Sequence, residues 1–131
     1  MSTVYETFQA AQQQIAAFSD QVARVPEENP ADLPELSRAI QEYASTFAQN
    51  YSEAHLSHEN SELSEALETT RDAVIESLGN IYSYIESFLA HSTQIPGANM
   101  GPLAASISAE LTSADRELRM ALEGLAKRGE G

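Results

Sequence analysis

The side chains best suited to chemistry lie together in a polar segment near the middle of the chain. His55, His58, Glu59 and Glu62 fall within a stretch of eight residues. On a continuous helix His55 would share a face with Glu59, and His58 with Glu62, because residues four apart are neighbours. Imidazole and carboxylate groups together are common ligands of zinc, iron and manganese. This segment is therefore the candidate metal site of the sequence.

The same four residues also fit a solvated helix end. Residues 52–61 contain only one large apolar side chain, Leu56, so no apolar face directs the histidines into a core. Metal sites in helical bundles usually draw Glu-x-x-His pairs from facing helices, and this chain has no such pair. We therefore favour the interpretation in which these groups contact water, and we assign no resident metal or cofactor.

The other polar residues form no recognisable catalytic set. The chain has no cysteine, which excludes disulfides, thiolate nucleophiles and sulfur-ligated metals. No serine lies in a Gly-x-Ser-x-Gly turn, and no glycine-rich phosphate loop is present. Carboxylates recur along residues 62–76 at the spacing typical of a solvated helix face. We therefore expect a protein without enzymatic activity.

Aromatic residues offer a second kind of candidate site. Core packing accounts for most of those that could line a ligand pocket, namely Tyr43, Phe47, Tyr51, Tyr82, Tyr84 and Phe88. Tyr84 lies off the main apolar stripe of its segment. It is therefore the aromatic residue best placed for an exposed contact.

Amphipathic helices must position these side chains. The first apolar stripe alternates spacings of four and three residues, in the order Val4, Phe8, Ala11, Ile15, Phe18, Val22 and Val25. Such spacing is the seam of a heptad repeat. Thr3 and Glu6 have the spacing of a capping box, so we expect a helix over residues 3–25.

Three further helices are expected, over residues 33–56, 61–92 and 102–128. Prolines 26, 30 and 34 separate the first two helices, and the loop ending at Pro102 separates the last two. A break near residues 57–61 is favoured because Glu62 and Glu65 then lie in a helical first turn. The alternative is one rod of about 60 residues, which would require oligomerisation to bury its stripe.

Four periodic segments without an alternating strand pattern predict an all-α fold. The helices are long for a chain of 131 residues. We therefore expect a single helical domain, residues 1–131, built as an elongated antiparallel bundle with coiled-coil-like packing. The third stripe widens between Val74 and Leu89, so this part should contact at least two neighbouring helices.

The net charge of the chain limits the kinds of partner that it is expected to bind. It carries 20 acidic and 7 basic residues, for a formal net charge of −13, which disfavours binding to nucleic acid or anionic lipid.

No apolar run approaches the roughly 18–20 residues needed to cross a bilayer, so no membrane insertion is expected. The first residues lack the pattern of a cleaved signal peptide. We expect a cytoplasmic protein, with export without a cleaved signal as the alternative.

The first functional hypothesis is a non-enzymatic interaction or assembly protein. Such an adaptor, small chaperone-like protein or structural subunit would work through helix–helix contacts, with a protein partner or as a homo-oligomer. A strict and narrow heptad seam is typical of coiled coils, which favours self-association. The residues expected to make these contacts are Phe8, Ile15, Phe18, Val22 and Tyr84.

Two other hypotheses stay open. The second is a ligand- or metal-binding bundle that uses the His55, His58, Glu59 and Glu62 cluster. The third is an acidic decoy of a basic protein or DNA-binding partner, since an acidic surface attracts basic proteins.

Replacing both His55 and His58 with alanine should leave folding and oligomeric state unchanged, because their segment has no apolar face. Thermal unfolding, solution mass and metal analysis of the purified variant check this expectation. A large loss of stability, or loss of a stoichiometric metal present in the parent protein, would favour the metal-binding hypothesis instead.

Overall fold

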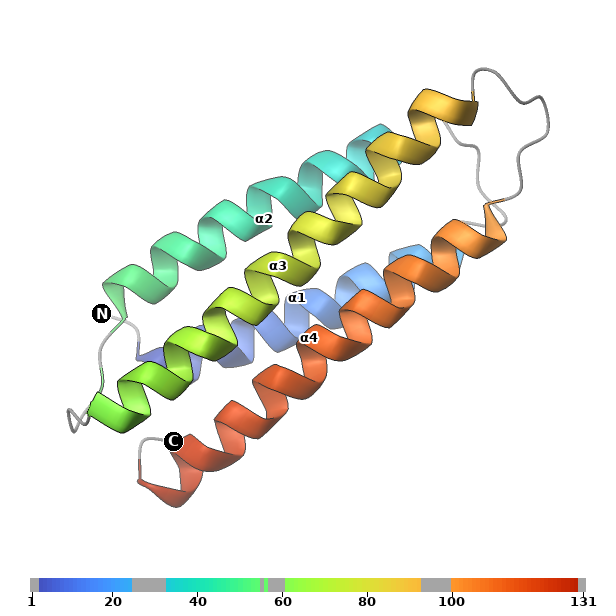
Figure 1. The fold of residues 1–131 in the computed structure, drawn as a ribbon. Helices are drawn as coiled ribbons and strands as arrows, with labels where there is room; N and C mark the ends of the chain where they lie inside the picture. Colours follow the sequence, from blue (N-terminus) through green and yellow to red (C-terminus); the bar gives the residue numbers. More distant parts are fainter. Residues whose placement is uncertain (1–2, 25–32, 55, 57–60, 93–99, 130–131) are drawn as a thin grey trace.

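Four α-helices form the part of the chain that the computed structural model describes, residues 3–24, 33–54, 56, 61–92 and 100–129 (Figure 1). Their bounds are α1 (Val4–Arg24), α2 (Leu33–Glu53), α3 (Ser61–Ser92) and α4 (Gly101–Lys127). Successive helices run in opposite directions along one long axis. The predicted all-α antiparallel bundle is confirmed.

Each helix packs against two neighbours, in the closed order α1, α2, α3, α4 and back to α1. The core lies on the common axis, and all four helices contribute side chains that are less than 2% exposed. The largest of these are Phe8, Ile40, Phe47, Leu78, Ile81, Ile85, Ile107, Leu111, Leu118 and Leu125. α3 contacts both α2 and α4, as expected for its wide apolar stripe.

Local hydrogen bonds fix two of the helix ends. At the start of α1, the Glu6 amide donates to Thr3 Oγ1 at 3.1 Å, and the Thr3 amide donates to Glu6 Oε1 at 3.5 Å. This is the predicted capping box, which satisfies amides that lack a partner in the first turn. After α4, Gly129 adopts a φ of 77°, the left-handed conformation that commonly ends a helix.

The break between the second and third helices is present, and the alternative of one continuous rod is wrong. α2 ends at Glu53 and α3 begins at Ser61, and the two helices pack side by side. α2 is three residues shorter than the predicted 33–56. The Ala54 amide donates to the Tyr51 carbonyl at 3.1 Å, an i to i−3 bond that tightens and closes the last turn.

The heptad seam of α1 packs inside the monomer. Phe8, Ile15, Phe18 and Val22 are all at most 4% exposed, so these four side chains offer no free surface to a partner in this fold. The expectation that they form a partner or dimer face stays a prediction, and in this fold the four side chains belong to the core of the bundle. A four-helix bundle uses the same heptad positions for its own core, so the seam needs no second chain to be buried.

Phe18→Asp should unfold the protein, because it places an unpaired charge in the core. We expect the free energy of unfolding to fall by about 3–5 kcal/mol, measured by chemical denaturation. Ser19→Asp is the matched control, since it adds the same charge at the neighbouring exposed position and should change stability little. A Phe18→Asp variant as helical and stable as this control would contradict the buried placement.

Candidate protein-binding groove

Aromatic side chains fill the junction between α1 and α2. The Phe18 ring centroid lies 6.2 Å from that of Tyr43, whose own centroid lies 6.3 Å from that of Phe47. Phe8 continues the series, with centroids 6.0 Å from Phe47 and 5.9 Å from Tyr51. These five rings, three from α2 and two from α1, are the aromatic series. They contact one another at distances typical of favourable ring pairs.

The far end of the aromatic series connects to α3. The Arg71 guanidinium carbon lies 5.2 Å from the centroid of the Tyr51 ring, within the range of a cation–π contact. Arg71 also forms an ion pair with Asp72 at 2.8 Å. The Tyr51 ring therefore contacts α1 on one side and α3 on the other.

Of the four neighbouring pairs of helices, α1 and α2 are packed least closely. The distance between packed helices depends on the size of the side chains at the contact. Large aromatic rings from both helices meet at this junction, so the backbones stand apart. The bundle is therefore closed on this side by side chains more than by close approach of its helices.

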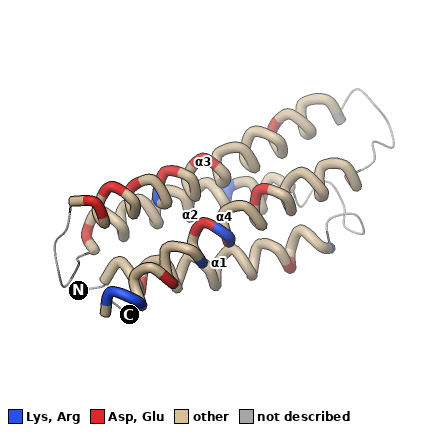
Figure 2. The backbone as a smooth tube through the Cα atoms, turned by 60° about the horizontal axis from the view of Figure 1, so that its bottom comes forward, with Lys and Arg blue, Asp and Glu red and all other residues tan. Residues whose placement is uncertain are grey.

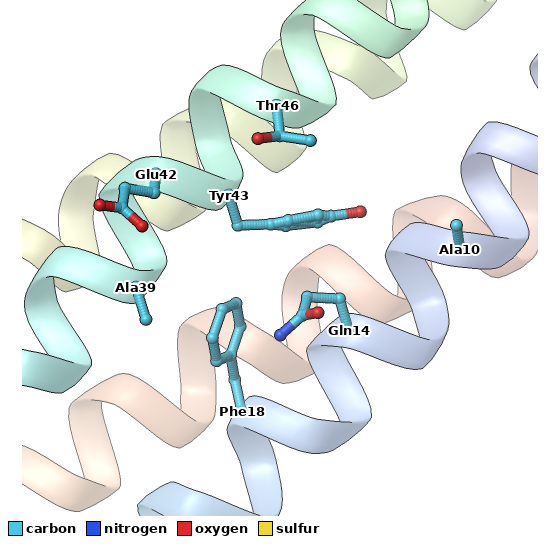
Figure 3. A pocket seen from close by; sticks show the side chains of 7 residues that line it. All are labelled: Ala10, Gln14, Phe18, Ala39, Glu42, Tyr43 and Thr46. Atoms are coloured by element: carbon cyan, nitrogen blue, oxygen red, sulfur yellow. The ribbon is translucent and has the colours of Figure 1, made fainter.

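An open groove of about 380 Å³ lies at this junction (Figure 3). Phe18 projects from α1 and Tyr43 from α2, and their rings meet between the two helices. The groove is lined by Ala10, Gln14 and Phe18 from α1 and by Ala39, Glu42, Tyr43 and Thr46 from α2. It thus has an aromatic floor, small alanine side chains, and polar groups along its edges.

Burial raises the pKa of the Tyr43 phenol to about 12. Removal from water disfavours the charged phenolate, which is the physical cause of the shift. The pKa of Tyr51 is raised as well, first by burial, while the nearby Arg71 charge acts in the opposite direction. Both phenols are half-buried, as expected for rings that pack on one side and reach solvent on the other.

The residues that line the groove are mostly uncharged. Glu42 is the single charged residue among the seven, and Gln14, Tyr43 and Thr46 supply one amide and two hydroxyl groups. The lining contains no histidine and no pair of carboxylates. General acid–base catalysis by two positioned groups therefore has no basis in this groove.

The histidine–glutamate cluster lies mostly outside the described residues. His55, His58 and Glu59 are not among them, and Glu62 is exposed in the first turn of α3. Within the described part of the chain, no group of three or more potential ligands is arranged to hold a metal ion. In the same part, no helix is long and apolar enough to span a membrane.

Tyr84 lies on α3, which does not line the groove. It is 39% exposed, and its hydroxyl donates to Glu110 Oε1 of α4 at 3.3 Å. Asn80 Nδ2 donates to the same oxygen at 3.3 Å. Tyr84 thus takes part in a polar bridge between α3 and α4, and its role in partner contact stays a prediction.

Sequence reasoning singled out Tyr43 as a possible pocket residue but missed most of the groove. The residues missed were Ala10, Gln14, Ala39, Glu42 and Thr46. One signal was present in the sequence. Small and polar residues flank the aromatic ones at helical spacing, so an exposed row on each helix runs beside a row of large rings.

Comparisons with family models, curated proteins and solved structures found no match for this chain. We therefore infer function from the residues that line the groove and from the charges around it.

The raised pKa of Tyr43 predicts a late step in the phenolate absorbance titration, near pH 12. The unfolded chain loses this proton near pH 10, so the contribution of Tyr43 to stability is complete below pH 10 and declines up to about pH 12. Tyr43→Phe should remove the step near pH 12, whereas Ser45→Ala, at an exposed position on the same helix, should retain it. A folded wild-type protein without a late step would contradict the burial of Tyr43.

Proposed function

We propose that this protein is a non-enzymatic protein–protein interaction module that binds an amphipathic helix of a partner protein in the α1–α2 groove. The observation that carries the proposal is the open groove itself, with Phe18 and Tyr43 in its floor and alanines beside them. Binding of an apolar helix face in a groove between helices is a recurrent mode of peptide recognition.

The spacing of the lining residues supports a helical occupant. On α1 they recur every four residues, at Ala10, Gln14 and Phe18, so this side of the groove extends about 12 Å along the helix axis. The α2 side has a similar length, from Ala39 to Thr46. A groove of two parallel edges fits the ridge of side chains on a third helix.

The open form of the groove argues for a macromolecular occupant. Small-molecule sites usually bury most of the surface of their ligand in a cleft or cavity. This groove instead lies open on the side that faces solvent. An apolar helix face would cover the exposed part of the Tyr43 ring and the exposed Ala10 and Ala39 side chains, and burial of this area would favour binding.

Filling the groove should abolish docking of a helical peptide. We suggest the double variant Ala10→Gln and Ala39→Gln, which places two longer side chains between the groove edges. The probe is a synthetic peptide of about 18 residues, roughly five helical turns, with Leu and Ala on one face and Gln on both flanks. Because the protein has no tryptophan, one Trp in the peptide reports binding through its emission.

We expect binding to weaken at least ten-fold in the filled variant and to be unchanged in the control variant Ala16→Gln and Ser45→Gln. These control positions are exposed on the same helices but do not line the groove. Equal binding by all three proteins would refute the proposal. A wild-type dimer that the filled variant converts to a monomer would also refute it, since a second copy would then occupy the groove.

A further inference from the structure

The two edges of the groove differ in charge. On α2, Glu42 lines the groove. Glu35 is exposed seven residues before Glu42, and Glu53 is exposed eleven residues after Glu42. At 100° per residue, these spacings place all three within about 20° of one direction around the helix. An acidic row therefore runs along the α2 edge. We call these three residues the acidic rim.

The carboxylates of the acidic rim are not neutralised by ion pairs. The ion pairs formed between described residues are Arg71–Asp72 and Arg119–Asp115, and neither includes the rim. Arg38 is the single basic residue of α2, and it makes no ion pair with Glu35 or Glu42. Glu53 accepts a hydrogen bond from the neutral amide of Gln49 at 3.3 Å. The rim charges are thus available to a partner.

The α1 residues that line the groove, Ala10, Gln14 and Phe18, are uncharged. Between Glu6 and Asp20, α1 has no charged residue, and its exposed side chains are glutamine, alanine and serine (Figure 2). Gln14 lies on the groove opposite Glu42 and Thr46. A docked helix would therefore meet carboxylates on one flank and neutral side chains on the other.

Building on the proposed function, we infer that the partner helix is basic on one flank, with Lys or Arg residues seven apart facing the acidic rim. Glu35 and Glu42 are about 10 Å apart along the axis of α2, which matches that repeat in a helix lying alongside. The other flank of the partner helix is polar and uncharged, so that it can lie against α1. The overall charge of −13 would add long-range attraction for a basic helix.

The test compares three versions of the Trp-containing peptide, with the same Leu and Ala face and with Lys, Gln or Glu at two positions seven apart on one flank. Each is titrated against the wild-type protein, the rim variant Glu35→Gln and Glu42→Gln, and the control variant Glu65→Gln and Glu76→Gln. Both variants lose two negative charges, but the control residues lie on α3 and do not line the groove.

We expect the wild-type protein to bind the Lys peptide roughly five- to ten-fold more tightly than the Gln peptide, because each exposed ion pair contributes modestly. The rim variant should lose this preference, and the control variant should keep it. Added salt should reduce the preference, since exposed charges are screened.

Three outcomes would overturn the inference. If the rim and control variants lose the preference equally, the net charge and not the rim attracts the peptide. If the three peptides bind equally but the groove-filling variant binds none, the inference fails while the proposed function stands. If the groove-filling variant binds all three as the wild type does, the proposed function fails as well.

Discussion

The constraint that gives this structure its groove is the aromatic series between α1 and α2. Phe8 and Phe18 on one helix meet Tyr43, Phe47 and Tyr51 on the other, with centroids about 6 Å apart. Rings of this size separate the two helices, yet they still exclude water from the axis of the bundle. The groove is the consequence, because the short side chains outside the rings cannot fill the space that the rings create.

The α1 seam is buried in the bundle, so the candidate binding surface lies beside it. The strongest apolar stripe of the sequence lies in the core of the bundle, and the groove lies at the edge of this stripe. At that edge Phe18 has two roles, since it is 2% exposed in the core and also lines the floor of the groove. A change to the Phe18 ring would therefore affect both the stability of the bundle and the shape of the groove.

Much of the fold could be predicted from sequence because helix ends and apolar stripes are local features. The predicted third helix, 61–92, coincides with α3, and the first and fourth differ from the structure by one residue at each end. The predicted end of the second helix, residue 56, was three residues too late, because the polar residues there gave no clear stop signal. The groove could not be predicted, because it depends on the distance between two helices. A heptad seam also looks the same whether its partner lies in the same chain or in another.

The most direct test of a binding surface at the α1–α2 junction is methyl NMR of the protein labelled at alanine and threonine, titrated with the Leu–Ala peptide. We expect chemical shifts to change at Ala10, Ala39 and Thr46, which line the groove, and not at Ala105, which is exposed on α4. Shift changes concentrated on α3 and α4, with the groove methyl groups unaffected, would contradict a binding surface at this junction.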